Sequence, residues 1–456
     1  MIQKIGIPKC YKDFHCIAEK CTDSCCAGWQ VDVDEASWEY YKTVQGEFGG
    51  YLHSVMVEVP EAEGQFRLRE DGRCPFLNDT GLCDLFSNLG ENRLCKTCTN
   101  YPRYMEEYGT LREVGIAFSC PEAARLMLSD SRPMEFEEIT LGPDADQWCD
   151  TAKDVMWRTA GMGASDMAEL MTNREETAAQ GFIVETETFD ESYFNMLYEG
   201  RKTAFFIVQQ RILSIEQRVL LYLDYAVALQ QLLDDWQQGE DDSFKVNLLV
   251  REYGNEQWLC KRWQQLYEEA CRWDADADGF QLYGETVPFG EVRYHLLPEF
   301  AAVLYGELKH CKPQWGPMLA EAEKVLKESM TPEEYAKTYR DFDTFFQGRE
   351  YEYEHLLSYF VFKYFLKAYF DDDVYGKAQL AAVGYLMVKQ LGVCHWVTHK
   401  GKFDRADQAE LFHLYSREME HSDENYETFV DSLKMENMCN FEHLMALLTE
   451  EGQDGK

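Results

Sequence analysis

The 456-residue sequence is short of basic residues and has no long apolar run. Its 44 lysines and arginines are outnumbered by 82 aspartates and glutamates, which gives a formal net charge of -38. This charge opposes binding to nucleic acid or to an anionic membrane surface, so we expect neither as a partner. A strongly negative surface would attract a cationic protein that presents lysines, although maintaining solubility is the simpler interpretation.

Signals for export and for membrane insertion are also missing. The N-terminal segment contains Asp13 and Glu19 and has no apolar stretch of the length that a secretory signal needs. The longest apolar stretches, 356–366 and 380–388, are interrupted by Lys363 or are too short to cross ~30 Å of hydrocarbon. We therefore expect a cytoplasmic protein.

Nucleotide-binding motifs are absent as well. No G-x-G-x-x-G follows a predicted strand and no P-loop sequence occurs. The sequence therefore supports neither a dinucleotide-binding fold nor a P-loop nucleotide-binding fold. The sequence shows no internal repeat and no low-complexity segment. With 45% hydrophobic and 14% aromatic residues the chain can bury a sizeable core, and the usual ~100–200 residues per domain predict two or three domains.

Cysteine is plentiful and concentrated at one end of the chain. Of the 16 cysteines, ten lie in the first 120 residues, and the other six are scattered as ordinary buried side chains would be. In a reducing compartment a disulfide framework is not expected, so metal binding, redox chemistry or burial must explain the clustering. Nine of the ten form the groups C-x4-C-x3-C-C, C-x8-C and C-x2-C and a last single residue, namely Cys16, Cys21, Cys25, Cys26, Cys74, Cys83, Cys95, Cys98 and Cys120.

These nine thiols are predicted to bind metal, because short spacings let one loop deliver two sulfurs to one ion. Four thiolates suit tetrahedral zinc and a [4Fe-4S] cluster equally, and a purely structural thiol cluster is a third alternative. Nine thiols exceed one site. Either two sites exist, or one site is accompanied by buried free thiols, which the pair Cys25-Cys26 favours because adjacent residues seldom both face one ion.

Residues 1–130 are predicted to form a compact unit of short strands and loops. The stretch 65–70 alternates like a strand, and 71–72 and 78–81 are turn signals. A hairpin is expected around Tyr108-Gly109.

A helix is predicted to begin near residue 120. Ser119 and Glu122 have the spacing of a capping box. Cys120 would then lie in the first turn, where the partial positive charge favours a thiolate and so a metal ligand.

The remainder is predicted to be a connecting segment, 131–190, followed by a helical domain, 191–456. Ser214 and Gln217 indicate a capping box before a stretch in which apolar residues recur every three or four positions. Comparable patterns cover 298–308, 317–330, 354–369, 376–391 and 407–420. The predicted fold class is therefore α+β, mostly α. His395 and His399 have the i, i+4 spacing of a zinc pair, but the glutamate of the metalloprotease motif is missing between them.

The motifs around the cysteines resemble those of the flagellin lysine-N-methylase family. They read F-H-C at 14–16, C-T-D-S-C-C-A-G-W at 21–29, C-P-F-L at 74–77, G-L-C at 81–83, L-C-x2-C-x2-Y-P-R at 94–103 and S-C-P-E-A-A-R at 119–125. They are more distantly similar to zinc- or iron-chelating cysteine domains. Nearer the C-terminus, Glu354-x2-Leu357-x-Tyr359 and the stretch S-R-E-x-E-H-S at 416–422 also resemble the methylase family.

The resemblance implies transfer of methyl groups from S-adenosylmethionine to lysine side chains of flagellin, with a [4Fe-4S] cluster on the cysteines. The C-x3-C-x2-C spacing of radical S-adenosylmethionine enzymes is absent, because Cys26 directly follows Cys25. An acceptor lysine of pKa ~10.4 must lose its proton before it attacks a methyl sulfonium, so the site needs a base or desolvation. Tyr101 lies beside the thiols, but a packed aromatic is the simpler interpretation, and the base stays unassigned.

The alternative function is a non-catalytic zinc or iron-sulfur module joined to a helical partner-binding domain. Only the enzyme requires S-adenosylmethionine, so binding of that molecule separates the two hypotheses.

Overall fold

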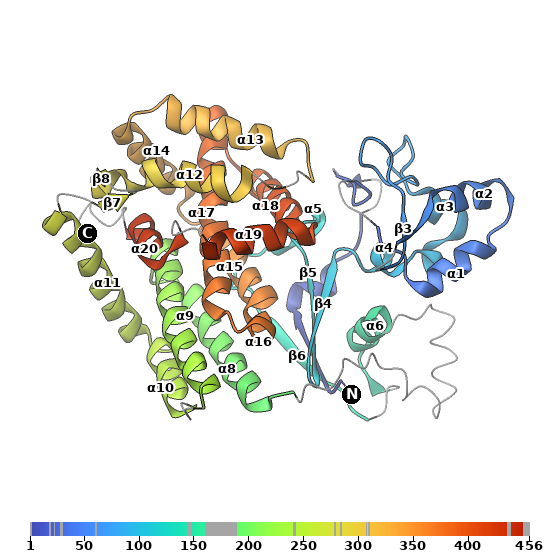
Figure 1. The fold of residues 1–456 in the computed structure, drawn as a ribbon, viewed down its shortest axis with the longest axis horizontal. Helices are drawn as coiled ribbons and strands as arrows, with labels where there is room; N and C mark the ends of the chain where they lie inside the picture. The colour runs from blue at the N-terminus through green and yellow to red at the C-terminus, as the bar shows by residue number, and fades with distance from the viewer. Residues whose placement is uncertain are drawn as a thin grey trace. The chain divides into compact units, whose positions relative to one another are not determined.

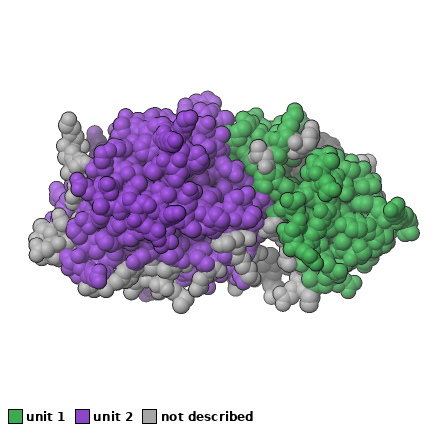
Figure 2. Space-filling view, turned by 90° about the horizontal axis from the view of Figure 1, so that it is seen from above, with its two compact units in different colours: residues 1–127, 135–189 green, residues 128–134, 190–456 purple. Residues whose placement is uncertain are grey.

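The computed structural model describes residues 2–17, 20–21, 23–27, 31–59, 62–143, 147–159, 189–239, 243–277, 280–282, 285–306, 308, 311–435 and 439–449. The chain divides into two compact units (Figure 2). Unit 1 comprises Met1–Met127 with Glu135–Phe189, and unit 2 comprises Leu128–Met134 with Asp190–Lys456.

Unit 1 contains a four-stranded mixed sheet with the order β4-β5-β1-β6. β4 (Arg103–Tyr108) and β5 (Leu111–Ile116) form the predicted hairpin, and Gly109 takes the positive φ of its turn. β1 (Lys4–Pro8) pairs in parallel with β5 and antiparallel with β6 (Phe136–Thr140). β6 and α6 (Asp150–Thr159) lie within the segment for which the sequence suggested only a connection.

The cysteines of unit 1 lie among short helices and a second hairpin. The helices are α1 (Glu35–Thr43), α2 (Gly46–Val55), α3 (Asp84–Leu89), α4 (Lys96–Asn100) and α5 (Pro121–Met127), with 3-10 turns at Lys9–Asp13 and Glu91–Arg93. The hairpin pairs β2 (Met56–Val59) with β3 (Ala62–Phe66), so the strand predicted over 65–70 ends four residues early. It ends there because its partner β2 begins only at Met56, where α2 has just ended at Val55.

A small apolar core holds this part of unit 1 together. Trp38, Tyr41, Leu52, Phe66 and Phe76 are all buried in it. β3 approaches α1 so closely that a Cβ at Gly64 would lie 2.3 Å from the ring of Trp38. Glycine is therefore required at this position for the hairpin to pack.

Unit 2 is almost entirely helical (Figure 1). Its helices are α8 (Glu191–Val208), α9 (Ile215–Gln237), α10 (Ser243–Tyr253), α11 (Glu256–Ala277), α12 (Val292–Gly306), α13 (Trp315–Ala322), α14 (Pro332–Phe346), α15 (Tyr351–Tyr364), α16 (Ala368–Asp371), α17 (Val374–Thr398), α18 (Arg405–Glu420), α19 (Asp423–Met435) and α20 (Phe441–Thr449). A hairpin of β7 (Phe280–Leu282) and β8 (Glu285–Val287) is added to them. α8, α9 and α10 lie side by side.

The mostly α, α+β fold class is confirmed, and the predicted helical patterns coincide with these helices except at three places, 298–308, 317–330 and 354–369. The first pattern ends two residues after α12, and the third spans α15, a 3-10 turn (Phe365–Lys367) and the start of α16. α9 begins with the predicted capping box, in which Ser214 Oγ accepts from Gln217 N and Gln217 caps the Ser214 amide in return. The pattern at 317–330 is divided between α13 and a π-helical turn, Glu323–Glu328.

α17 forms the centre of unit 2. It contacts α9, α13, α15 and α18, and 83% of its most apolar stretch of 18 residues is buried. By length and composition alone this helix could cross a membrane, but its burial matches the core helix of a soluble protein.

Candidate functional site

Five of the predicted metal ligands lie in or against the apolar core of unit 1, and four of them adjoin as two pairs. We name these four the inner thiol cluster: Cys26, Cys74, Cys95 and Cys98. The thiol of Cys26 interacts with that of Cys74, and the thiol of Cys95 interacts with that of Cys98. Cys98 also interacts electrostatically with both Cys26 and Cys74, so the two pairs adjoin.

Local backbone structure positions the inner thiol cluster. The Cys74 amide donates to Cys26 O at 2.7 Å, next to a β-bridge between Ala27 and Arg73. Cys95 is the N-cap of α4, and Cys98 lies within the first turn of the same helix. Cys95 and Cys98 thus come from one short spacing, whereas Cys26 and Cys74 are brought together from segments 48 residues apart by the backbone pairing.

A second group gathers elsewhere in unit 1. Cys16, Cys21 and Cys120 interact electrostatically with one another, and we name them the outer thiol cluster. Cys25 adjoins both groups: its sulfur lies 4.0 Å from that of Cys26, and it also interacts with Cys21. Cys83 lies beside the inner thiol cluster and interacts electrostatically with Cys26 and Cys74. The nine predicted ligands are therefore four in the inner cluster, three in the outer cluster, Cys83 next to the inner cluster and Cys25 next to both.

Two of the cysteines cap helices with their own sulfur atoms. Cys83 Sγ accepts from Phe86 N at the start of α3, and Cys120 Sγ accepts from the backbone of Glu122 and Ala123 at the start of α5. The predicted capping box is therefore wrong, because α5 begins at Pro121 and Cys120 lies where Ser119 was expected. Glu122 instead pairs with Arg125.

The surroundings of the thiols shift their pKa values in different directions: the interaction with Cys26 lowers the pKa of Cys74, whereas burial raises that of several others. Burial raises the pKa of Cys120 to about 12, although its bonds to the helix amides oppose the change. The hydrogen bond from Cys25 lowers the pKa of Cys26, but the bond to Cys74 and burial together raise it to about 12. Metal binding would therefore have to displace a proton from at least one thiol of each group, Cys26 and Cys120.

The donor chemistry fits a soft, thiophilic metal. Sulfur is the only donor in either group, which suits zinc or an iron-sulfur cluster and does not suit calcium or magnesium. Within the described residues, however, no three histidine, cysteine, aspartate or glutamate side chains are already arranged as metal ligands. The sulfurs would have to move into a common coordination geometry when a metal binds.

The two other sequence candidates make different contacts. Tyr101 donates its hydroxyl hydrogen to Ser119 O at 2.7 Å and is half-buried, as expected of a packed aromatic. His395 and His399 stack at 3.8 Å between ring centroids, and His399 Nδ1 lies 2.9 Å from His395 O, so one ring nitrogen of His399 is engaged by the backbone.

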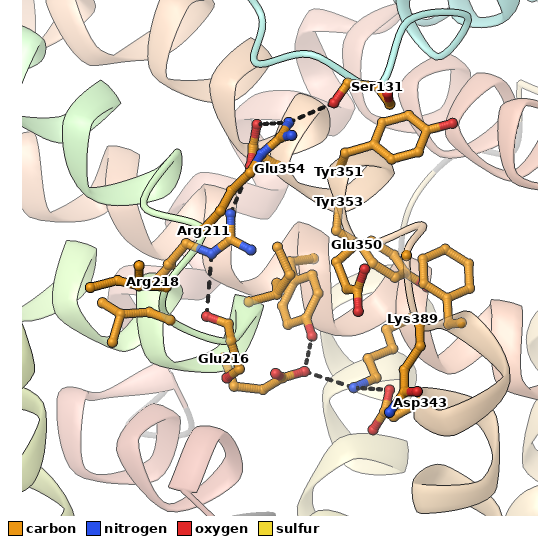
Figure 3. Close-up of a pocket in the computed structure, with 18 of the residues that line it drawn as sticks. Ser131, Arg211, Glu216, Arg218, Asp343, Glu350, Tyr351, Tyr353, Glu354 and Lys389 are labelled. Carbon is orange, nitrogen blue, oxygen red and sulfur yellow. Dashed lines mark hydrogen bonds and ion pairs between the residues drawn. The ribbon is translucent and has the colours of Figure 1, made fainter.

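Unit 2 contains a cavity of about 680 Å³ (Figure 3). It is lined by the loop before α9 and the first turns of α9, by the end of α14, by the start of α15 and by side chains of α17. Ser131, from the short segment of unit 2 that precedes β6, completes the lining.

Two networks of charged side chains border this cavity. Glu354, fully buried on α15, accepts two bonds of 2.8 Å from Arg211 and one of 2.8 Å from Arg218. Lys389, on α17, lies 2.7 Å from both Glu216 and Asp343.

Aromatic rings lie beside the second network. Tyr385 donates its hydroxyl hydrogen to Glu216. Tyr353 packs edge-on against Tyr385 and also contacts Phe346.

The two family-like segments near the C-terminus meet in unit 2. Tyr359 and Tyr364 on α15 both donate to the Glu420 carboxylate on α18, at 2.7–2.9 Å. Ser416 donates to the same carboxylate, and Lys363 lies 3.0 Å from it. Segments separated by about 60 residues thus form one buried polar cluster.

The sequence interpretation missed the cavity. Of its charged residues, only Glu354 had been singled out, through family resemblance. Lys389 offered a signal, because a lysine at the end of the apolar stretch of α17 must find anionic partners if it is buried. Its partners come from α9 and α14, and nothing local identifies them.

Fold and site together define a mostly helical α+β protein with a cysteine-rich N-terminal unit. Comparison with known proteins narrows this class. The FliB lysine N-methylase C-terminal domain matches residues 201–447, more than half of the chain, and the protein belongs to this family.

Two curated relatives agree with this assignment. A lysine-N-methylase of Salmonella typhimurium (strain LT2) is 27% identical over 133 residues, which cover 28% of this chain and 33% of that protein. The flagellar biosynthetic protein FliU of Salmonella muenchen is 26% identical over 130 residues, or 27% of this chain and 77% of that protein. The match therefore spans a third of the lysine-N-methylase. No solved structure matches the chain significantly.

Proposed function

We propose that this protein transfers methyl groups from S-adenosylmethionine to lysine side chains of flagellin in the cytoplasm. The observation that carries the proposal is the family match over residues 201–447. The relative named lysine-N-methylase supports the reaction, and the flagellar name of the second relative supports the substrate. The net charge of -38 would assist encounter with a lysine-bearing partner.

We further propose that unit 1 binds a [4Fe-4S] cluster, with zinc as the alternative metal. The inner thiol cluster would hold it, because its four sulfurs adjoin one another in a small apolar core. The outer thiol cluster and Cys25 would then supply a second site or remain free thiols.

In the transfer step, the lysine nitrogen forms a bond to the methyl carbon as the bond from that carbon to sulfur breaks. The electron pair of the broken bond stays on sulfur, and S-adenosylmethionine becomes S-adenosylhomocysteine. Before the attack the lysine must give up one proton to a base or to water.

The test compares wild-type protein, purified without oxygen, with the double variant Cys95→Ser plus Cys98→Ser. Methyl transfer to flagellin is followed with labelled S-adenosylmethionine, and iron, sulfide, zinc and visible absorption are measured on the same samples. The wild type should be coloured and active, and the variant should lose its metal. The matched control is Cys260→Ser plus Cys271→Ser on α11, two half-buried cysteines of unit 2, which should retain both properties.

A non-catalytic zinc module is the second candidate function. It is favoured by the burial of Cys74 and Cys95 in the small apolar core, which a structural ion would stabilise further. Colourless protein with stoichiometric zinc and no methyl transfer would establish this alternative and refute the enzyme.

A further inference from the structure

The cavity of unit 2 carries opposite charges at its two networks. The network at Glu354 sets two guanidinium groups, of Arg211 and Arg218, against one carboxylate, an excess of one positive charge. The network at Lys389 sets one ammonium group against two carboxylates, of Glu216 and Asp343, an excess of one negative charge. Figure 3 shows the two networks on different sides of the cavity.

Both networks can reach a ligand. Arg211 and Asp343 have 42% and 35% of their side-chain surfaces exposed, whereas Arg218 and Lys389 each have 4%. The buried Glu354 thus holds the exposed Arg211 in place, and the buried Lys389 holds the exposed Asp343.

A tyrosine ring of the cavity lining lies beside the negative network. The Lys389 ammonium lies 6.0 Å from the ring centroid of Tyr385, within the range of cation-π attraction. This end of the cavity already surrounds one cation with carboxylates and an aromatic ring.

The volume decides between a side chain and a small molecule. About 680 Å³ lies within the ~300–1,000 Å³ typical of small-molecule sites. The stem and ammonium of a single acceptor lysine would leave most of this volume unfilled, and an acceptor lysine offers no anionic group to the arginines.

We propose that this cavity binds a dipolar small molecule, with a carboxylate at the arginine end and a cationic centre several bonds away at the Glu216–Asp343 end. S-adenosylmethionine has this charge arrangement, with its amino-acid carboxylate and its sulfonium, and its adenosine would occupy the remaining volume. The choice of this particular ligand rests on the proposed function.

Calorimetry on the full chain tests the proposal, with S-adenosylmethionine and S-adenosylhomocysteine as ligands. The two share the carboxylate, but the second lacks the sulfonium charge. Arg211→Gln should weaken binding of both ligands by about tenfold or more, since a hydrogen bond to a charged group is lost. Asp343→Asn should weaken the binding of S-adenosylmethionine by a similar factor and should weaken the binding of S-adenosylhomocysteine much less.

Matched controls are available in unit 2. Arg262→Gln breaks a comparable pair with Asp224, and Asp341→Asn lies two residues from Asp343 on α14 but pairs with Lys337. Neither residue lines the cavity, so both variants should bind the two ligands as the wild type does. Thermal unfolding of every variant reports whether unit 2 is intact.

The outcomes separate the site from the function. If the wild type binds S-adenosylmethionine and both cavity variants bind it equally well, the donor site lies elsewhere and the proposed function stands. If Asp343→Asn weakens the binding of both ligands equally, the cationic centre of the ligand does not lie at the Glu216–Asp343 end and the proposal is wrong. If the wild type binds neither ligand, the proposed function fails together with the inference.

Discussion

Glu418 is a buried carboxylate whose ionisation opposes folding. Its oxygens accept from the Lys312 amide at 2.6 Å and the Cys311 amide at 3.0 Å, yet burial raises its pKa to about 7. In the unfolded chain the same group titrates near 4.5. Between these values the native state holds more protons than the unfolded state, so stability falls as the pH rises.

The variant Glu418→Gln should remove this dependence. From pH 5 to pH 8 the wild type should lose about 2–3 kcal/mol of unfolding free energy relative to the variant, because one pKa unit corresponds to ~1.4 kcal/mol. Urea unfolding at the two pH values measures the difference. Parallel changes in the two proteins would mean that Glu418 is ionised throughout this range.

Single residues of the site differ in how far the sequence reveals them. The nine cysteines stand out by spacing alone. Their division into groups depends on contacts such as the one between the thiols of Cys26 and Cys74, which are 48 positions apart in the sequence. Arg218 lies within α9 and Glu354 within α15, and neither residue shows a local sign of pairing. Even so, Arg218 Nη1 donates to Glu354 Oε2 at 2.8 Å. Long-range ion pairs of this kind leave no periodic pattern.

Among the elements, α14 carries Asp343 to the cavity and begins with a capping box. Thr331 Oγ accepts from the Glu334 amide, Glu334 caps the Thr331 amide in return, and Pro332 occupies the first helical position. These interactions satisfy amides that the helix itself leaves unpaired.

Thr331→Ala should therefore lower stability by about 1 kcal/mol, the usual cost of losing a polar N-cap. Thr344→Ala, an exposed position on the same helix, is the control and should change stability by about 0.5 kcal/mol or less. Thermal or urea unfolding at neutral pH compares the two variants. Equal losses would show that the cap contributes nothing special to α14.

The sequence predicted elements well where local signals suffice. The capping box and apolar periodicity of α9 are local, and so is the turn at Gly109 between β4 and β5. The pairing of β1 with β6 was missed because it joins residues more than 120 positions apart. The start of α5 was misplaced by one residue because Pro121 fits the first helical position and the Cys120 sulfur caps the helix.

At the scale of the whole molecule, each unit has its own core. The thiol groups lie in unit 1, and the described cavity lies in unit 2. If the thiols hold a metal as proposed, its removal should act on unit 1 alone.

Hydrogen exchange on metal-replete and chelator-treated full-length protein tests this independence. Protection should fall in residues 73–99, with local opening easier by several kcal/mol, because metal binding and folding are coupled in small thiol sites. Protection in α9, α15 and α17 should not change. A loss of protection in α17 would instead mean that the stability of unit 2 depends on the metal.

The strand order β4-β5-β1-β6 also has a consequence for synthesis on the ribosome. β1 is the first strand to be made, but its neighbours β5 and β6 begin only at Leu111 and Phe136. At roughly 5–20 residues per second, β1 waits about 5–20 s for its first hydrogen-bonded neighbour. Eight of the nine grouped cysteines are translated within that interval, between β1 and β5, so the nascent chain presents them as accessible thiols before the sheet can close.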